Sequence, residues 1–373
     1  MDDDIEAFRE QVRRYIVGEL APNMEDWRGQ GRVPREVWRR FGEMGFLLPE
    51  MPEEYGGAGV SVAWQLVVQD ELSRAEVPGI TGVHSIASHY LLAYGTEEQR
   101  RRWLPKLVSG EHLAAIAMTE PGCGSDLKAL RLTAQRDEND YLINGTKTFI
   151  TNGDTATLLI LACRTGGPGS RGVSLIVVET GNLAGFSVGR RLKKLGQHAS
   201  DTAELNFSGV RVPVANLLGG VEGQGFAQLM SQLPYERMLI AVPAAAVIER
   251  ALELTVQYTR ERRAFGQSIA EFQNTRLKLA EVATLAHVVR GFVNDCIQRL
   301  VDGTLDNEAA YMAKWWCTEQ QCKAVDECLQ FFGGYGYMTE YPIARLYADA
   351  RAQRIYGGTN EIMKDLIARK LFA

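Results

Sequence analysis

The sequence lacks the patterns that mark metal enzymes and disulfide-stapled proteins. Its six cysteines form no CxxC pair, and its five histidines form no HExxH motif and no pair at i, i+4 spacing. His84 and His89 are five residues apart, so their imidazoles do not share a helical face. We therefore expect no metal site and interpret the cysteines as reduced, mostly buried thiols.

Long hydrophobic runs and a basic charge excess are also missing. The longest apolar run, Leu239–Ile248, is too short to cross a bilayer and contains Pro243. The 373 residues carry a formal net charge of −5, which argues against a nucleic-acid partner. The start, Met1-Asp2-Asp3-Asp4, is acidic where a signal or transit peptide would be basic. These features predict a bacterial cytoplasmic protein without membrane insertion, and a mature organelle protein would share the same features.

Hydrophobic periodicity divides the chain into three parts. Residues 1–112 carry apolar side chains at helical spacing. Residues 113–220 contain short β-rich runs, among them Leu158–Cys163 and Val173–Glu179, at the spacing of a small β-barrel or sandwich. Residues 221–373 return to long helical patterns such as Phe226–Glu261. We therefore predict an α+β multidomain protein with an N-terminal helical domain, a central β domain and a C-terminal helical bundle.

Two glycine-containing segments match known sequence patterns. Gly167–Gly172 matches GxGxxG, but a β-rich run follows it where a dinucleotide fingerprint needs a helix, so we interpret it as a loop. Tyr141–Ile150 carries Asn144-Gly145 between alternating residues, which predicts a β-hairpin.

The segment Met118–Asp126 is a candidate ligand loop. Its glycines let the backbone approach a ligand closely, and Thr119 and Ser125 offer hydroxyl groups. Free N–H groups in such a loop can hold an anion. From these residues alone, a polar turn between domains is an equally good interpretation.

Glu236 is the one charged residue on an otherwise apolar helix face. The other residues of that face, at alternating spacings of four and three, are Leu229, Leu233, Ile240, Pro243 and Val247. Burying a lone ionised carboxylate is costly, so its pKa should rise, which suits a general base near neutral pH. The alternative is a structural salt bridge with a neighbour such as Arg237.

Four segments resemble, in order, the signature motifs of the acyl-CoA dehydrogenase family. They are Ala117–Asp126, Arg262–Gly266, Gln330–Tyr337 and Ile355–Ile362. The resemblance covers essentially the whole chain and is closest to the long-chain and isovaleryl branch. It implies the family's fold, with an N-terminal α-helical domain (1–112), a central small β-barrel (113–220) and a C-terminal four-helix bundle (221–373).

One departure from the usual family pattern points to the long-chain and isovaleryl branch. Most members have the catalytic glutamate directly after the tyrosine of the last motif, where this sequence has Gly357. The long-chain and isovaleryl enzymes place the base on an earlier helix in a Glu-Arg pair, and Leu233–Arg237 resembles that segment. The resemblance thus implies Glu236 as the catalytic base, with the Gly357 N–H as a donor to the thioester oxygen.

The resemblance also implies positions that bind FAD and acyl-CoA. FAD contacts within one subunit are implied for Met118, Thr119, Gly124, Ser125, Phe149, Thr151, Thr359 and Glu361. Contacts to the FAD of a neighbouring subunit are implied for Arg262, Phe265, Gln273, Gln330 and Gly334. Acyl-CoA contacts are implied for Ser125, Ser200, Pro234, Tyr235, Arg237, Gly357 and Gly358. The second set implies at least a dimer, and the family is usually a homotetramer, a dimer of dimers.

We therefore expect FAD-dependent α,β-dehydrogenation of saturated medium- to long-chain fatty acyl-CoA to trans-2-enoyl-CoA. The α-proton of a thioester is weakly acidic, so this reaction needs a positioned base and hydrogen bonds to the enolate-like oxygen. By resemblance, the electrons pass to electron transfer flavoprotein.

Three alternatives stay open at this point. One is a dehydrogenase of branched, terpenoid or carrier-protein-tethered acyl groups. Another is a flavin monooxygenase or oxidase on the same fold, and the third is a non-catalytic helical scaffold. Chain length is open too, because the small residues Gly79, Gly82 and Ala87 suit either a long acyl tail or close helix packing.

Overall fold

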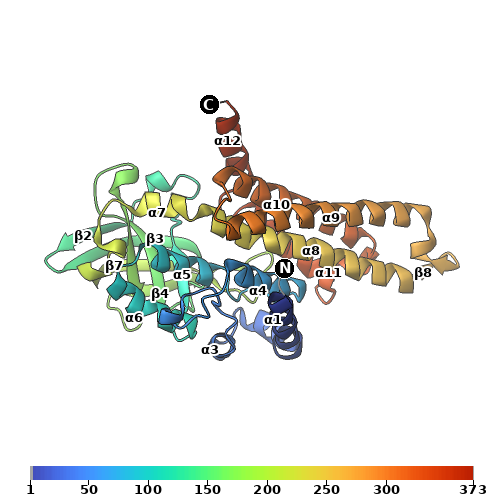
Figure 1. Cartoon of the computed structure of the whole chain (residues 1–373), viewed down its shortest axis with the longest axis horizontal. Helices are drawn as coiled ribbons and strands as arrows, with labels where there is room; N and C mark the ends of the chain where they lie inside the picture. The colour runs from blue at the N-terminus through green and yellow to red at the C-terminus, as the bar shows by residue number, and fades with distance from the viewer. Residues whose placement is uncertain (1–2, 373) are drawn as a thin grey trace.

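Helices, then strands, then helices follow one another along the chain in the computed structural model, which describes residues 3–372. In Figure 1 the strands lie at the left, the long C-terminal helices extend to the right, and the first helices pack below the junction. This order confirms the fold class expected from the sequence. The acidic start noted above begins at Met1 and Asp2, which lie outside the described residues.

The N-terminal region is helical. Its α-helices are α1 (Asp3–Tyr15), α2 (Met24–Gln30), α3 (Arg35–Glu43), α4 (Val62–Arg74), α5 (Val83–Tyr94) and α6 (Glu97–Val108). A capping box starts α6: the Gln99 N–H donates to Thr96 Oγ1 at 3.2 Å, and the Thr96 N–H donates to Gln99 Oε1 at 3.1 Å. The helix that matters most for the site is α5, which packs between α6 and the sheet.

A curled sheet of seven strands forms the middle of the described chain. The strands are β1 (Ala114–Ala117), β2 (Thr133–Asp137), β3 (Asp140–Thr151), β4 (Leu158–Arg164), β5 (Val173–Glu179), β6 (Phe186–Arg191) and β7 (Thr202–Pro213). Their order is β1-β4-β2-β3-β7-β6, and β5 pairs with β4. Because side chains alternate along β4, Leu158 and Ile160 join the core shared with the N-terminal helices, whereas Leu159 and Leu161 join the core of the sheet itself.

The Asn144-Gly145 dipeptide is not a hairpin turn, so that prediction was wrong. Strand β3 runs straight through it, pairs with β7 on both sides, and shifts register between Ile143 and Gly145. Gly145 has φ +141, and a Cβ there would lie 2.9 Å from Leu132, so the glycine serves a bulge. The chain instead reverses between β2 and β3, at Glu138 (φ +55). The Gly167–Gly172 segment connects β4 to β5 and is a loop, as predicted.

Long helices make up the C-terminal region. They are α7 (Gly225–Ser231), α8 (Leu233–Glu261), α9 (Gln273–Val301), α10 (Asn307–Gln330), α11 (Pro342–Ala350) and α12 (Asn360–Leu371), and a short hairpin, β8 (Arg263–Ala264) with β9 (Gln267–Ser268), joins α8 to α9. The predicted single helix Phe226–Glu261 is divided at Gln232, because Pro234 lacks the N–H that would continue the α7 ladder.

Helix α8 lies at the centre of this region. It packs against α4, α9 and α10, and its apolar segment Leu239–Ile248 is buried throughout. No helix within residues 3–372 is long and apolar enough to cross a membrane.

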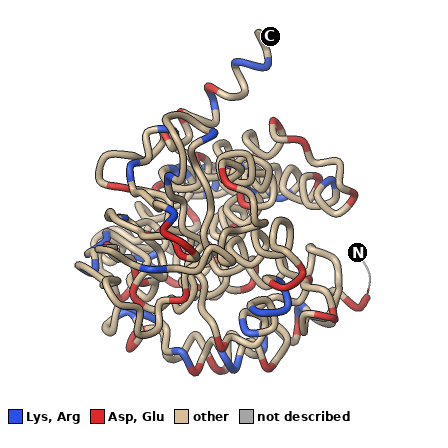
Figure 2. The backbone as a smooth tube through the Cα atoms, turned by 90° about the vertical axis from the view of Figure 1, so that its left-hand side faces the viewer, with Lys and Arg blue, Asp and Glu red and all other residues tan. Residues whose placement is uncertain are grey.

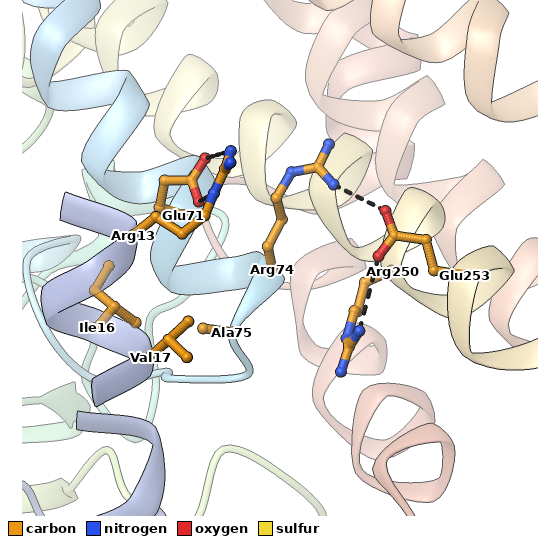
Figure 3. Close-up of a pocket in the computed structure, with 8 residues that line it drawn as sticks. All are labelled: Arg13, Ile16, Val17, Glu71, Arg74, Ala75, Arg250 and Glu253. Atoms are coloured by element: carbon orange, nitrogen blue, oxygen red, sulfur yellow. Dashed lines mark hydrogen bonds and ion pairs between the residues drawn. The ribbon is translucent and has the colours of Figure 1, made fainter. Parts of the chain in front are cut away.

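Ion pairs at α4 join it to α1 and, through Arg290 on α9, to the C-terminal bundle. Asp70 on α4 accepts hydrogen bonds from Arg9 at 2.9 Å and from Arg290 at 2.8 Å, while Glu71 accepts from Arg13 at 2.8 Å. A cavity of about 370 Å³ opens beside them; Figure 3 shows its lining residues, which are Arg13, Ile16, Val17, Glu71, Arg74, Ala75, Arg250 and Glu253. None of these is a predicted site residue, so the cavity belongs to the joint between the two regions.

The surface mixes both signs of charge, and the last helix stands apart from the body. Figure 2 shows lysine, arginine and acidic residues interspersed along the backbone, with the C-terminal end projecting at the top. That end carries Leu371 and Phe372, which are 68% and 90% exposed. All six cysteines are free thiols, and only Cys322 among them is not fully buried, which confirms their interpretation.

Candidate functional site

Glu236 lies in the first turn of α8 with its carboxylate buried. The Tyr90 hydroxyl on α5 donates a hydrogen bond to Glu236 Oε1 at 2.6 Å. Burial raises the pKa of Glu236, and the Tyr90 hydrogen bond and the Arg237 charge oppose this rise without cancelling it. The pKa direction expected from the apolar helix face is therefore confirmed.

Arg237 does not form the salt bridge considered as an alternative role for Glu236. Its guanidinium carbon lies 5.0 Å over the ring of Tyr311 on α10, and its Nε faces Met363 Sδ at 3.3 Å. Within residues 3–372 no ion pair joins Arg237 to Glu236, although the two are consecutive. The Glu236 carboxylate thus has a hydroxyl donor rather than a cation as its hydrogen-bonding partner.

The Gly357-Gly358 turn packs directly against the part of α8 that carries Glu236. A Cβ at Gly357 would lie 2.4 Å from Cδ1 of Ile240, which is one helical turn beyond Glu236. A Cβ at Gly358 would lie 2.6 Å from the end of Met363. Both glycines also have positive φ values, +64° and +83°, so this turn requires residues without side chains. The fold therefore places five of the predicted acyl-CoA contacts near one another. Pro234, Tyr235 and Arg237 are in the first turn of α8 with Glu236, and Gly357 and Gly358 form the turn that packs against this helix.

Lys314 on α10 holds the same turn through hydrogen bonds, and it is not among the residues predicted from the sequence. It is fully buried, and its Nζ donates to Gly358 O at 2.6 Å and to Asn360 Oδ1 at 3.0 Å. Burial lowers the pKa of Lys314 to about 7. The spacing that drew attention to Glu236 was present here as well, because Lys314 shares a buried face with Ala310 and Cys317.

The loop Met118–Asp126 is held to the sheet by a buried ion pair. Lys147 on β3 donates to Met118 O and to Glu120 Oε1, both at 2.9 Å. Glu120 also accepts from the backbone N–H groups of Arg131 and Leu132 at 2.8 and 2.9 Å. These bonds fix the path of the loop that carries Met118, Thr119, Gly124 and Ser125.

Several of the predicted FAD positions are exposed or unobstructed. Phe149, at the end of β3, is 67% exposed and has φ +58. Gly124 faces open space, with no atom within 4 Å of the position of a Cβ. Thr359 caps α12 by accepting from the Ile362 N–H at 3.3 Å, so free N–H groups of a helix start lie close to Glu361. Ser200, by contrast, is buried in the turn that ends at β7, with its N–H bonded to Gln197 O.

The second group of predicted FAD positions lies at the far end of the molecule. The rings of Tyr258 and Phe332 stack at 4.3 Å, which joins the C-terminal ends of α8 and α10. Arg262 lies over Tyr335 at 5.9 Å at that end, and Phe265 is 95% exposed there. In Figure 1 this end, marked by β8, is at the right and the β domain is at the left. One chain therefore does not bring Arg262, Phe265, Gln273, Gln330 and Gly334 together with the Met118–Thr151 positions.

Comparison with known proteins identifies the family. Models of the acyl-CoA dehydrogenase N-terminal, middle and C-terminal domains match residues 2–111, 115–210 and 223–372. The chain belongs to the acyl-CoA dehydrogenase family. Its enzyme class is accordingly that of an acyl-CoA dehydrogenase, an oxidoreductase.

Named acyl-CoA dehydrogenases resemble the chain over nearly its full length. The mouse (Mus musculus) mitochondrial long-chain specific acyl-CoA dehydrogenase is 44% identical, over 98% of this chain and 86% of that protein. The potato (Solanum tuberosum) mitochondrial isovaleryl-CoA dehydrogenase is 35% identical, over 100% of this chain and 91% of that one. Similarity to both branches agrees with the resemblance found in the motifs.

Solved structures of the family share the fold. The crystal structure of acyl-CoA dehydrogenase from Geobacillus kaustophilus is 44% identical and superposes with a TM-score of 0.97, covering 100% of this chain and 99% of that one. A glutaryl-CoA dehydrogenase from Mycobacterium smegmatis, solved in complex with FADH2, is 28% identical with a TM-score of 0.92, covering 100% of this chain and 95% of that one.

Proposed function

We propose that this acyl-CoA dehydrogenase removes the α- and β-hydrogens of saturated medium- to long-chain fatty acyl-CoA in an FAD-dependent reaction that yields trans-2-enoyl-CoA, with Glu236 as the catalytic base. The observation that carries the proposal is the buried Glu236 carboxylate beside the Gly357 turn, in a chain that has no carboxylate at position 357. The 44% identity to a long-chain specific enzyme supports the substrate class.

The protein's own contribution to the reaction follows from this arrangement. Glu236 takes the α-proton, and its raised pKa makes the carboxylate a stronger base than an exposed one. The Gly357 N–H donates to the thioester oxygen as negative charge develops there, which lowers the barrier because the donor is already in place. FAD, when bound, supplies the acceptor for the hydride that leaves the β-carbon. Phe149, Thr119 and Ser125 would hold the cofactor.

The same reasoning extends to the assembly and the electron acceptor. The second group of predicted FAD positions lies at the other end of the molecule from Phe149, so these residues can complete a cofactor site only in a second copy. They are Arg262, Phe265, Gln273, Gln330 and Gly334. The exposed side chains Phe265 and Phe372 fit contacts between such copies. We therefore propose a homotetramer. That its electrons pass to electron transfer flavoprotein is proposed from the resemblance to the family alone. The cytoplasmic location and the domain boundaries 1–112, 113–220 and 221–373 stay predictions.

The experiment is anaerobic bleaching of the flavin by a ladder of acyl-CoAs. The ladder runs from short to long straight chains and includes isovaleryl-CoA and a terpenoid acyl-CoA. Rapid bleaching by medium and long straight chains is the expected result. Bleaching by a branched substrate alone would keep the mechanism and change the substrate class, and a yellow protein that no acyl-CoA bleaches would contradict the proposal.

Glu236→Gln tests the base directly. The substitution keeps the size of the side chain and its bond to Tyr90 but removes the basic oxygen. The variant should retain flavin and lose at least about 10³-fold in the bleaching rate, the scale on which a positioned general base acts. Full bleaching at the wild-type rate would show that another residue is the base.

A further inference from the structure

The hydroxyl of Tyr90 lies against the carboxylate of the proposed base and has no role in the reaction as described so far. Tyr90 is 1% exposed, so its phenol is fixed in the packing of α5. Its oxygen lies 2.6 Å from Glu236 Oε1 and 3.3 Å from the carbonyl oxygen of Leu229 on α7. The hydroxyl has one proton and therefore donates to one of these two acceptors at a time.

Helix α5 holds the first turn of α8 at two consecutive residues. Besides the Tyr90–Glu236 bond, the hydroxyls of Ser85 and Tyr235 lie 2.5 Å apart. The Tyr235 ring also stacks on His89 at 3.9 Å, and His89 Nε2 lies 2.9 Å from Glu50 Oε1. Since Tyr235 is held by its own contacts, the docking of α8 does not depend on Tyr90 alone, and the shorter of the two Tyr90 contacts is the one to the carboxylate.

We propose that Tyr90 is the positioning residue of the base: its hydroxyl holds Glu236 Oε1 and thereby leaves Oε2 as the oxygen that takes the α-proton. This inference rests on the proposed function of Glu236. Within residues 3–372 Oε2 has no hydrogen-bond partner, and it is not one of the fully buried polar atoms that lack one, so part of it stays accessible to a substrate.

The hydroxyl suits both states of the base. A hydrogen bond to an ionised oxygen is stronger than one to a neutral oxygen, so Tyr90 favours the carboxylate before the reaction. After Oε2 has taken the proton, Oε1 is a weaker acceptor, and the Tyr90 hydroxyl can turn to Leu229 O. The proton stays on Glu236 throughout, and the tyrosine is never deprotonated, because burial first and Glu236 second raise its pKa far above the usual value.

Two groups act directly on the pKa of Glu236, the Tyr90 hydroxyl on α5 and the Arg237 charge on α8. Farther out, Tyr94 faces Tyr90, while Tyr311 and Lys314 on α10 face Arg237, and Glu361 on α12 faces Lys314. Among these, Tyr90 is the one that hydrogen-bonds the carboxylate. Its removal should therefore shift the titration of the base more than any other neutral substitution in this set.

The test is exchange of the α-proton of bound 3-thiaoctanoyl-CoA in D2O, followed by mass spectrometry from pH 5 to 9. The sulfur at the β-position has no hydride to give, so exchange reports on the base alone. Tyr90→Phe is compared with Tyr94→Phe, which removes a hydroxyl from the same helix at a ring that lies 6.2 Å away. Dissociation constants of the thioester are measured in parallel.

In Tyr90→Phe, we expect the pH profile of exchange to move up by about one unit, because the lost bond favoured the ionised form. Exchange below the midpoint should fall about tenfold for the same shift, while the dissociation constant changes less than about twofold. Tyr94→Phe should match the wild type. A Tyr90→Phe profile that also matches the wild type would overturn the proposal, as would a dissociation constant that weakens as much as exchange does.

Two further variants separate this proposal from the one it rests on. Glu236→Gln should abolish exchange; if it exchanges like the wild type, the base assignment fails and takes the Tyr90 proposal with it. Glu236→Asp keeps a carboxylate but withdraws it from Tyr90 by one methylene. In that background Tyr90→Phe should cause no further pH shift, and an undiminished shift would show that Tyr90 acts elsewhere.

Discussion

The buried pair of Lys147 and Glu120 gives the sharpest prediction on stability. Lys147→Met keeps the length of the side chain and removes the ammonium, which leaves Glu120 as a buried carboxylate without its cation. Burial by itself would raise the pKa of Glu120, but Lys147 and the N–H groups of Leu132 and Arg131 outweigh it and hold the pKa below the usual value. Burial also lowers the pKa of Lys147, so the pair stabilises the folded chain at neutral pH through the ionised Glu120 carboxylate and not through the ammonium.

The expected cost follows from what Glu120 retains. Removing one partner of a buried pair costs roughly 3–5 kcal/mol. Glu120 keeps its two backbone N–H donors, at 2.8 and 2.9 Å, so we expect the lower end, about 3 kcal/mol. The measurement is urea unfolding at pH 7, with Lys193→Met, an exposed lysine of the same region, as the matched control. The control should stay within about 0.5 kcal/mol of the wild type.

A double-mutant cycle and a pH series decide whether the charge is the cause. Glu120→Gln combined with Lys147→Met should cost at least about 1 kcal/mol less than the two single changes added together, because the uncompensated charge is then absent. The deficit of Lys147→Met should also shrink as the pH falls and Glu120 takes up a proton. In the wild type, the stabilising effect of the ionised Glu120 carboxylate is present above the unfolded pKa of 4.5. It is lost as the pH falls through the lower pKa of the folded state. Additive costs, or a deficit independent of pH, would refute this reasoning.

Two more predictions concern the Gly357–Asn360 turn. Burial lowers the pKa of Lys314 to about 7, so between pH 7 and 10.5 the unfolded chain binds one proton more than the folded chain and stability should rise with pH. In urea unfolding, Lys314→Met should remove up to about 1.4 kcal/mol per pH unit of that rise. Equal slopes of stability against pH in variant and wild type would contradict this reasoning. Gly357→Ala places a Cβ at φ +64 and 2.4 Å from Ile240 Cδ1, so it should destabilise by about 1–2 kcal/mol in the same assay, while Gly291→Ala, in open space on α9, should stabilise by about 0.5–1 kcal/mol. A Gly357→Ala protein as stable as the wild type would show that this turn is free to change its backbone conformation.

The sequence by itself determined the features that depend on local periodicity. Side chains three and four residues apart share a helix face whatever lies opposite, so the spacing around Glu236 predicted both its burial and the direction of its pKa. The order of helices and strands followed in the same way. The two local errors came from signals with more than one meaning. Asn144-Gly145 suits a bulge as well as a turn, and the continuous apolar pattern hid the helix break at Pro234.

Only the tertiary structure decided which distant side chains meet. Tyr90 and Glu236 are 146 positions apart, and Lys314 and the carbonyl of Gly358 are 44 apart. No periodicity links such pairs, because their distance depends on how whole helices pack and on the bends between them. The structure also separated Phe149 from Phe265, two residues predicted to contact FAD. Phe149 is on β3 and Phe265 is beside β8, at opposite ends of the molecule. The physical reason is the same in each case: a side chain's own helix fixes its direction, but the docking of another element fixes its partner.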